Sequence, residues 1–570
     1  MNKKLEKYKQ NLYEFREVRD LKQMLYSSAQ MFSEKTGYLV KERIGGPYLP
    51  ITFQQFREDV DGLGTALLEL GLEGKKIAII GENRYDWLVA HMAALCGVGI
   101  SVPLDKELPA GEVANLLNRS GASTLIYSSK VEKRVLQALE GTSGVEYLIS
   151  MDAQEDTEIS KSMSQLVSRG RYLIAHGDYS FINAPIDPNA MAILLFTSGT
   201  TGLAKGVMLS HKNICSNVYA MSKFVNVSAP DEVALSVLPM HHTYEQTCLQ
   251  MTCLYQGCTV AYCEGLKYIT KNMAEAKATV TVAVPLIYES MHKKVWKKAE
   301  QGGKADKMRK GISLSKKLSI LPPKATKSLF KDVHAALGGT MRTLIAGGAA
   351  IDPHVVEDFR AMGFNIFQGY GMTECSPIIA VNMDRYSKPA SVGLPVPGTR
   401  IKLTDMDENG VGEIICKSDS VMLGYYENEE ETAKVLKDGW LHTGDYGRFD
   451  EDGFLYICGR KKNVIVTKNG KNIFPEEVEF YLMKSDFIAE VVVRGKDDEK
   501  SGETIVWAEI YPDFTNIKEQ KGDISQDELK ALIKREIDMA NDQMSTYKRV
   551  KRFKLRDTEF EKTTTKKIKR

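Results

Sequence analysis

The sequence lacks any apolar run approaching the roughly 20 residues that a membrane-spanning helix needs. Its first residues, Met1–Lys7, are mostly charged or polar and have no apolar core of the kind found in signal peptides. The net charge is only +2 over 570 residues, which argues against a general nucleic-acid binder. Together these absences predict a cytoplasmic protein with no nucleic-acid partner.

Cysteine is also sparse, with nine residues and no C-x-x-C pair, which excludes a disulfide scaffold and favours reduced thiols. Four of them recur at every fifth position and leave a metal site open as a hypothesis: Cys248, Cys253, Cys258 and Cys263. Steps of five residues turn by about 140° on a helix, so the four do not share a face. We therefore favour buried free thiols on a helix and the strand that follows it.

Short continuous apolar segments alternate with amphipathic helical patterns along much of the chain. This alternation predicts parallel sheets with helices on both faces. It begins with strands at 76–81, 97–103 and 124–127 and resumes between 233 and 369. Beyond Lys388 the pattern changes to short β segments with turns, and a smaller mixed α/β unit begins at Gly459. Apolar residues at helical spacing also predict a helix over 12–40.

A glycine- and hydroxyl-rich loop lies between two apolar runs within residues 194–207. Its backbone N–H groups and hydroxyls can surround a polyphosphate, and Lys205 adds positive charge. It is not a Walker A loop, because Leu203 and Ala204 separate Gly202 from Lys205 and a second apolar run follows at once. We expect a strand, a loop and a second strand; the alternative is a plain surface turn.

Three further motifs follow in order. In the segment 368–374, Tyr370 can stack on a purine, Thr373 can bond a phosphate, and the Glu374 carboxylate suits Mg²⁺. The alternative is an ordinary first turn of a helix with an acid near its positive end. Asp445 stands in a glycine-flanked turn fifteen residues before Arg460, and the chain ends in the basic stretch 561–570.

Together, these motifs closely resemble the ordered signatures of the adenylate-forming (AMP-binding) superfamily. The resemblance spans residues 194–567, and the N-terminal third agrees in pattern only. The segments 238–245 and 284–289 look like the long-chain fatty acyl-CoA synthetase branch. The fold implied is α/β: a large N-terminal domain of two parallel α/β subdomains plus a β-rich subdomain, with a small mobile α+β C-terminal domain. The expected bounds are 1–458, a hinge at 459–463, and 464–570.

The resemblance also implies roles for individual residues, with ATP and Mg²⁺ as cofactors and coenzyme A as co-substrate. Lys567, Thr373, Glu374 and His242 would be catalytic, Glu374 and Thr197 would hold the metal, and Lys462 would be the hinge pivot. The residues expected to bind the nucleotide are Thr197, Ser198, Gly199, Thr200, Thr201, Gly202, Lys205, Gly347, Gly348, Ala349, Gln368, Gly369, Tyr370, Asp445 and Arg460.

Two of these roles stay open at this stage. The family's closing motif commonly reads K-T-x-x-G-K-I-x-R, and Lys566 stands here where the glycine is expected. This departure puts the local turn in question and leaves Lys566 as an alternative to Lys567. His242 would approach the phosphates or the carboxylate, or it is a packed core histidine.

The function implied is ATP-dependent activation of a long-chain fatty acid to acyl-AMP, followed by thioester formation with coenzyme A. The alternatives are an acyl-AMP-forming ligase for another carboxylic acid or for a carrier-protein thiol, and a non-catalytic sensor, which we disfavour because the site residues are present. Leu249, Met251 and Leu254 are candidates for an apolar acyl pocket. A homodimer is a further expectation.

Residues 293–331 contain thirteen Lys or Arg and two acidic residues, a net charge of +11, with apolar residues between them. Such a segment can rest on an anionic bilayer, which would make the protein peripheral at the inner membrane surface. A solvated helical insert that serves solubility is the alternative. Nucleic acid is a third possibility, but aromatics for base stacking are few.

Overall fold

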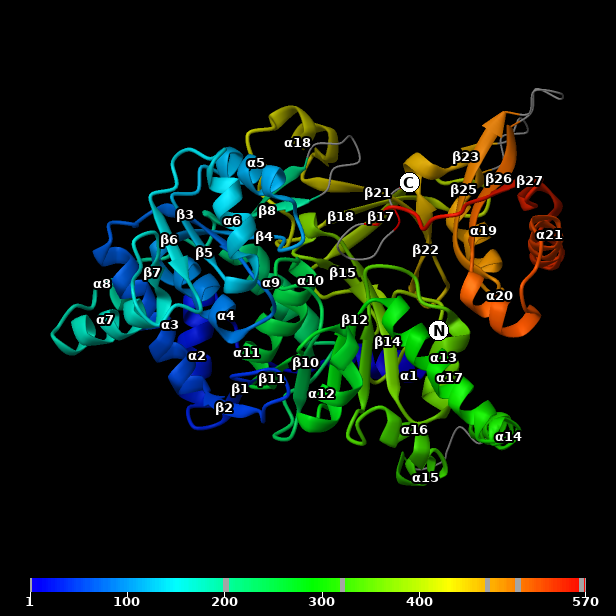
Figure 1. Cartoon of the computed structure of the whole chain (residues 1–570), viewed down its shortest axis with the longest axis horizontal. Coiled ribbons are helices and arrows are strands. Elements are labelled where there is room, and N and C mark those ends of the chain that lie inside the picture. The colour runs from blue at the N-terminus through cyan, green and yellow to red at the C-terminus, as the bar shows by residue number, and fades with distance from the viewer. Residues whose placement is uncertain are drawn as a thin grey trace. The chain divides into compact units, whose positions relative to one another are not determined.

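The computed structural model describes residues 3–197, 204–317, 323–466, 472–497, 504–562, 568 and 570, and the chain forms two compact units (Figure 1). The larger unit comprises Met1–Arg400, Cys416–Leu441 and Glu451–Phe454. The smaller unit comprises Ile401–Ile415, His442–Asp450 and Leu455–Arg570. No helix in the described ranges is both long and apolar enough to cross a membrane.

One sheet of the larger unit carries the glycine-rich loop. Its strand order is β19-β9-β8-β4-β3-β5-β6-β7, and β8 and β9 are its antiparallel pair next to the loop. The remaining neighbours from β8 to β7 are parallel. The bounds are β3 (Lys75–Ile80), β4 (Gly99–Leu104), β5 (Thr124–Tyr127), β6 (Tyr147–Ser150), β7 (Lys161–Ser162), β8 (Met191–Thr197), β9 (Lys205–Ser210) and β19 (Gly424–Tyr425).

The second sheet of the larger unit has a parallel centre and antiparallel edges, in the order β16-β15-β14-β13-β12-β10-β11-β1-β2. Its central strands are short apolar runs, as expected for strands buried on both faces. The bounds are β1 (Thr36–Val40), β2 (Leu49–Thr52), β10 (Val233–Ser236), β11 (Thr259–Tyr262), β12 (Val280–Ala283), β13 (Thr343–Ala346), β14 (Asn365–Gly371), β15 (Ile378–Val381) and β16 (Leu394–Pro395).

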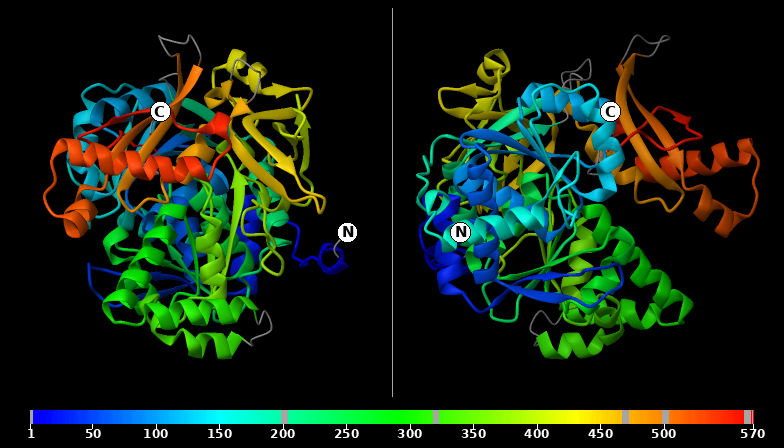
Figure 2. Two further views of the ribbon diagram at one scale, coloured as in Figure 1. Left: turned by 90° about the vertical axis from the view of Figure 1, so that its right-hand side faces the viewer. Right: turned by 60° about the vertical axis from the view of Figure 1, so that its left-hand side comes forward.

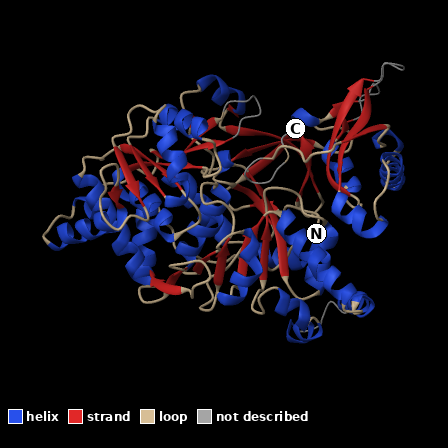
Figure 3. Ribbon diagram, in the orientation of Figure 1, coloured by secondary structure: helices blue, strands red, loops and turns tan. Residues whose placement is uncertain are grey.

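Helices surround the strands of both sheets (Figure 3). Fully buried side chains such as Leu344, Phe359 and Ile366 join β13, α17 and β14 into one core. The helices of this unit are α1 (Lys3–Gln10), α2 (Leu21–Met31), α3 (Phe53–Glu69), α4 (Tyr85–Ala93), α5 (Ala110–Ser120), α6 (Glu132–Leu139), α7 (Met163–Ala175), α8 (Ser180–Asn183), α9 (His211–Ser222), α10 (Thr243–Glu245), α11 (Thr252–Gln256), α12 (Ile269–Glu275), α13 (Pro285–Gln301), α14 (Ala305–Lys317), α15 (Pro323–Leu329), α16 (Lys331–Ala336), α17 (Pro353–Ala361) and α18 (Glu429–Val435).

The smaller unit has its own core, built on a sheet in which β25 and β26 are antiparallel and β26 and β27 are parallel. Buried residues of α19 and α21, including Val478 and Ile533, pack in that core. An antiparallel pair of strands, β21 and β22, precedes it along the chain. The bounds are β17 (Arg400–Thr404), β18 (Gly412–Lys417), β21 (Trp440–Phe449), β22 (Leu455–Arg460), β25 (Ile488–Asp497), β26 (Thr504–Pro512), β27 (Arg552–Leu555), α19 (Pro475–Leu482), α20 (Phe514–Lys521) and α21 (Gln526–Asp542).

The predicted α/β class, with parallel sheets and a smaller C-terminal domain, is confirmed. The helix predicted over 12–40 is wrong at both ends, because α2 begins only at Leu21, where Asp20 accepts a hydrogen bond from the Gln23 N–H. Residues 36–40 form β1 instead, where parallel pairing with β11 outweighs the helical spacing. The boundary at 458 and the hinge stay predictions.

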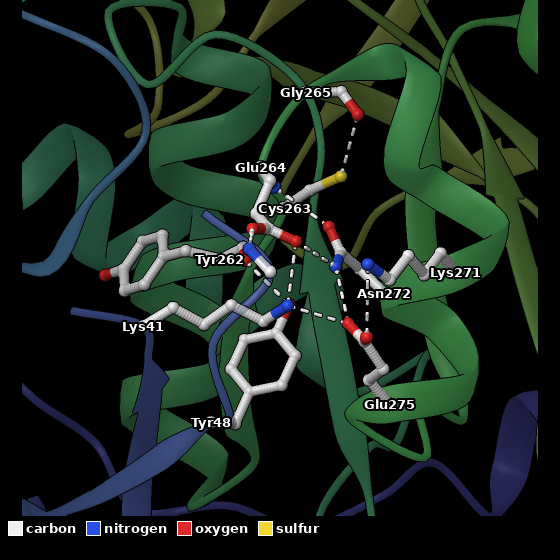
Figure 4. Close-up of polar contacts among 10 residues, drawn as sticks. Lys41, Tyr48, Tyr262, Cys263, Glu264, Gly265, Lys271, Asn272 and Glu275 are labelled. Carbon is white, nitrogen blue, oxygen red and sulfur yellow. Dashed lines mark hydrogen bonds and ion pairs between the residues drawn. The ribbon is translucent and has the colours of Figure 1, made fainter. Parts of the chain in front are cut away.

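A buried ion-pair network lies where β1 and β11 end (Figure 4). Lys41 Nζ lies 2.7 Å from both Glu264 Oε2 and Glu275 Oε2, and the Lys41 side chain is only 5% exposed. Asn272 donates to both carboxylates. Burial opposes ionisation of Glu264, but the hydrogen bonds from Lys41 and Asn272 outweigh it and lower its pKa to about 2.

We expect Lys41→Met to destabilise the larger unit by about 3 kcal/mol, because it leaves two carboxylates without their buried cation. Lys271→Met is the matched control, since Lys271 also faces Glu275 but at 3.7 Å and with a side chain that is 53% exposed. The control substitution should lower the free energy of unfolding by about 0.5 kcal/mol or less. Urea unfolding followed by tryptophan fluorescence measures both, and equal losses in the two variants would contradict the prediction.

Candidate functional site

The two ends of the glycine-rich loop are fixed by the sheet. Thr197 at the end of β8 pairs with Lys205 at the start of β9, so the predicted strand–loop–strand arrangement is correct. Arg119 of α5 donates to the Ala204 carbonyl at 2.9 Å, and its guanidinium lies over the Phe196 ring. Ser198, Gly199, Thr200, Thr201 and Gly202 lie outside the described residues.

Lys205 is held by two residues from a distant part of the sequence. Its ammonium lies 2.5 Å from Glu431 Oε2 and 4.9 Å from the centroid of the Tyr425 ring. Both partners are positioned by β19 and α18: Tyr425 pairs with Val207 of β9, and Asn428 caps the first turn of α18 at the Glu431 N–H. The local backbone therefore places a carboxylate and an aromatic face beside the loop's lysine.

The same tyrosine connects Lys205 to Glu374. The Tyr425 hydroxyl donates to Glu374 Oε1 at 2.8 Å, while its ring faces the ammonium of Lys205. Thr373 and Glu374 begin a single 3₁₀ turn, Thr373–Cys375, directly after β14. The structure thus places Lys205 and Glu374, which the sequence assigned to phosphate and metal, on either side of one tyrosine.

The oxygen atoms of Glu374 and Thr197 are of the type that Mg²⁺ prefers. Magnesium takes hard oxygen ligands and commonly uses one or two carboxylates together with phosphate oxygens and water. Glu374 would supply a carboxylate, one oxygen of which accepts a hydrogen bond from the Tyr425 hydroxyl, and Thr197, whose hydroxyl donates to the Lys205 carbonyl at 3.4 Å, would supply a second oxygen. When bound, the ion would neutralise phosphate charge.

Six of the residues predicted to bind the nucleotide lie directly after β13 or within β14, two adjacent parallel strands. Gly347–Ala349 come directly after β13, and the Tyr244 ring packs so closely on Gly347 that a Cβ there would lie 2.6 Å from the ring. Gln368 is buried, and its amide donates to the Pro389 carbonyl at 3.0 Å, so this side chain holds a neighbouring loop. Gly369 and Tyr370 continue β14, and the Tyr370 side chain is partly exposed.

His242 stands at the start of α10, after β10, with its ring 4.1 Å from that of His241. Burial lowers the pKa of His241 to about 3, so that imidazole is neutral at physiological pH and its contact with Asp105 is not an ion pair. The candidate acyl-pocket residues Leu249, Met251 and Leu254 are all buried. Between α10 and α11 the chain forms a π-helical turn, Gln246–Met251.

Glu245 lies fully buried in the same segment, where it accepts hydrogen bonds from Ser236 at 2.6 Å and from Gln250 at 3.1 Å. Burial raises its pKa to about 7. The protonated Glu245 carboxyl therefore stabilises the folded state fully below its ordinary pKa of about 4.5. This stabilisation is lost as the pH rises through about 7.

We expect Glu245→Gln to remove this pH dependence. Relative to the wild type, its unfolding free energy should rise by up to about 3 kcal/mol between pH 5 and pH 8. Thermal unfolding at several pH values measures the difference, with Glu140→Gln on the exposed end of α6 as the control. A constant difference between variant and wild type across that range would show that Glu245 keeps an ordinary pKa.

In the smaller unit, Asp445 and Arg460 are opposite each other on β21 and β22. The Arg460 Nε lies 2.8 Å from Asp445 Oδ1, and the Asp445 side chain is only 5% exposed. Lys461 binds Glu413 at 2.6 Å, and Lys462 follows within the turn Lys461–Asn463. Desolvation and the nearby guanidinium groups of Arg460 and Arg570 lower the pKa of Lys462.

The C-terminal stretch is described only in part. Lys566 and Lys567 lie outside the described residues. On either side of them, Lys562 binds Glu490 and pairs with Ile568, and Arg570 binds Glu479. Both flanks of the predicted catalytic lysine are therefore attached to the smaller unit.

The cysteines are free thiols, and seven of the nine are buried. Burial raises the pKa of Cys263 to about 11 and that of Cys248 further. A hydrogen bond with Cys258, together with burial, raises the pKa of Cys253, so these thiols are protonated at neutral pH. This agrees with the prediction of buried free thiols.

Comparison with known sequences identifies the group to which the chain is related. The AMP-binding enzyme profile matches residues 28–426, and the AMP-binding enzyme C-terminal domain profile matches residues 462–570. The chain belongs to the AMP-binding enzyme family. It is 31% identical to long-chain-fatty-acid–CoA ligase 5 of Rattus norvegicus over 490 residues, which cover 79% of this chain and 70% of that protein. It is 28% identical to the long-chain-fatty-acid–CoA ligase FadD15 of Mycobacterium bovis, over 94% of this chain and 92% of that protein.

Solved structures of this family share the fold. The anthranilate CoA ligase AuaEII in complex with anthranoyl-AMP superposes with a TM-score of 0.75 at 19% identity, covering 98% of this chain and 97% of that one. The o-succinylbenzoate CoA synthetase of Bacillus subtilis, in complex with ATP and a magnesium ion, gives 0.70 at 22% identity over 96% and 98%. Family membership and these relatives support an AMP-forming acid–CoA ligase as the class of enzyme.

Sequence reasoning missed the residues that surround Lys205. Glu431 is 226 positions away and reads as part of an ordinary acidic first turn of a helix. Tyr425 lies in a two-residue strand with no apolar alternation around it, and Arg119 reads as a solvated helix residue. No local pattern marks them, since each acts through a contact with a distant segment.

Proposed function

We propose that this chain activates a long-chain fatty acid with ATP and transfers the acyl group to coenzyme A. A carboxylate oxygen attacks the α-phosphorus, the α–β P–O bond breaks, and pyrophosphate leaves. The coenzyme A thiolate then attacks the acyl carbon, the bond to the phosphate oxygen breaks, and AMP leaves. The main observation behind this proposal is that one residue, Tyr425, contacts both Lys205, through its ring, and Glu374, through its hydroxyl.

Lys205 supplies charge for the β- and γ-phosphates in this proposal, and Glu374 and Thr197 would hold Mg²⁺. Glu431 and Tyr425 are positioning residues that fix the ammonium of Lys205 at the base of the loop. Such preorganised charge needs no rearrangement when negative charge develops on the leaving group. Thr373 contacts phosphate, and Tyr370 stacks on the adenine ring, with Gly347–Ala349 beside it.

Asp445 forms hydrogen bonds with the ribose hydroxyls, and Arg460, whose Nε lies 2.8 Å from Asp445 Oδ1, orients that carboxylate. Lys567 bridges the attacking carboxylate and the α-phosphate. Rotation of the C-terminal domain about Lys462 would then withdraw Lys567 and admit coenzyme A, a hinge motion between half-reactions. The relatives named as long-chain-fatty-acid–CoA ligases support the choice of acid.

The test is AMP release with coenzyme A across acids from acetate to oleate, with aromatic acids and o-succinylbenzoate included. We expect the highest kcat/KM for the long-chain acids, since each buried methylene contributes about 0.8 kcal/mol. A preference for an aromatic acid would overturn the long-chain assignment while leaving acid–CoA ligation intact.

A carrier-protein thiol as acceptor is the alternative, and it has the same first half-reaction. Pyrophosphate release without coenzyme A-dependent AMP release would favour it.

A further inference from the structure

The basic segment 293–331 runs from α13 to the start of α16, and these helices lie at one edge of the larger unit (Figures 1 and 2). Twelve of its Lys and Arg side chains are exposed. They are Lys293, Lys294, Lys297, Lys298, Lys304, Lys307, Arg309, Lys310, Lys316, Lys317, Lys327 and Lys331. Because the whole chain carries only +2 and residues 293–331 carry +11, the remaining residues carry a net −9. The charge is therefore concentrated on one part of the surface.

Acidic neighbours neutralise only some of these side chains. Lys304 pairs with Asp332 at 2.7 Å, and Arg309 pairs with Asp306 at 2.7 Å. Lys316 lies 3.2 Å from both Glu357 and Asp358 of α17.

Helix α14 presents one face to the core and another to solvent. Met308, Gly311 and Ile312 are buried, and the ring of Phe330 packs on Gly311. Lys307, Lys310, Leu314 and Lys317 recur at i, i+3, i+7 and i+10, and all four are exposed. Within the described residues, none of these three lysines lies in an ion pair.

Two leucines with large exposed areas lie among these basic side chains. Leu314 is 50% exposed in the middle of the three lysines, and Leu329 of α15 is 43% exposed. The Leu329 side chain also lies against Gly311, one turn before Leu314, so the two leucines belong to one surface. We name this surface, made of Lys307, Lys310, Leu314, Lys317 and Leu329, the α14 face.

We propose that the α14 face docks the protein on an anionic lipid bilayer. Lysines around an exposed leucine suit this partner, because their long stems lie on the apolar boundary while the ammonium groups reach lipid phosphates. A nucleic-acid groove would instead favour planar arginines and stacking aromatics. Helix α14 carries one exposed arginine, Arg309, whose guanidinium lies 5.8 Å from the centroid of the Trp296 ring, whereas the α14 face itself consists of lysines and leucines. The net negative remainder of the chain is repelled by the same membrane, which orients the α14 face toward it.

The purpose of docking rests on the proposed function, since a long-chain fatty acid partitions into bilayers and would be collected there. Vesicle binding itself needs no catalysis. If the protein binds vesicles but does not activate fatty acids, only the proposed function fails. If it is an active ligase that does not bind vesicles, only the docking proposal fails.

The experiment is co-sedimentation of the full chain with vesicles of phosphatidylcholine, with and without phosphatidylglycerol. We expect binding only to the anionic vesicles at low salt and release at high salt. The triple variant K307Q/K310Q/K317Q should bind about 100-fold more weakly, at about five-fold per lysine. L314S should weaken binding about ten-fold without changing the net charge.

The matched control is K133Q/K267Q/K530Q, which removes the same charge at three exposed lysines elsewhere. It should bind as the wild type does, and circular dichroism should show that all variants are folded. Absence of wild-type binding at low salt would overturn the proposal, as would equal losses in the two triple variants. Binding of single-stranded RNA in place of anionic vesicles, with loss in K307Q/K310Q/K317Q, would also overturn it.

Discussion

Lys205→Gln is expected to reduce acyl-AMP formation by roughly 100- to 1000-fold, the range seen when one preorganised charge-stabilising donor is removed. Glutamine keeps a polar side chain at the position but cannot neutralise phosphate charge. Thioester formation from preformed acyl-AMP should stay within about three-fold, because pyrophosphate has already left by then. Single-turnover measurements of the two half-reactions give both numbers.

Lys434→Gln is the control for this prediction. Lys434 binds the other oxygen of the same Glu431 carboxylate, at 2.6 Å, but its side chain is 55% exposed. It shares the local ion pair and has no proposed contact with ATP, so its loss should change either half-reaction by less than about two-fold. A similar loss in both variants would mean that Lys205 matters only for local structure.

Lys567→Ala should show the sharpest separation of the two half-reactions. Adenylation should fall by roughly 1000-fold, because the variant loses the cation proposed to bridge the attacking carboxylate and the α-phosphate. Thioester formation from preformed acyl-AMP should be nearly unchanged, since the proposed rotation removes Lys567 before that step. Rapid-quench measurement of acyl-AMP and acyl-CoA separates the two.

Lys566→Ala decides between the neighbouring lysines. The departure from glycine at this position leaves Lys566 as the alternative, and the variant should retain adenylation within about three-fold. The two lysines exchange roles if Lys566→Ala shows the loss and Lys567→Ala does not. Equal loss in both half-reactions of Lys567→Ala would remove the assigned role altogether.

Much of the larger unit follows from local pattern. Continuous apolar runs predicted β3, β4 and β5, and turn residues between two apolar runs predicted the β8–β9 pair. The helix predicted over 12–40 was wrong, although Asp20 offers a cap immediately before Leu21. Spacing alone extended that helix past its actual end, because the strand at 36–40 depends on pairing with a distant partner.

The motifs of the candidate site could be predicted from the sequence, but the residues that position their side chains could not. Lys205, Glu374, Asp445 and Arg460 each stand in a short signature, and family resemblance supplied their roles. Glu431 stands in no recognisable sequence motif, because its contact with Lys205 depends on the pairing of β19 with β9 in the sheet. Neighbours brought together by non-local strand pairing require the folded structure.

The most direct test of the proposed chemistry uses oleate labelled with ¹⁸O in its carboxylate, together with ATP, Mg²⁺ and coenzyme A. Attack of the carboxylate on the α-phosphorus followed by thiolysis must leave one labelled oxygen in AMP, which mass spectrometry of the product nucleotide detects. We expect AMP that carries one labelled oxygen, oleoyl-CoA that keeps the other in its carbonyl group, and unlabelled pyrophosphate, all in equal amounts. Label in orthophosphate with formation of ADP, or AMP without label, would contradict the acyl-adenylate route.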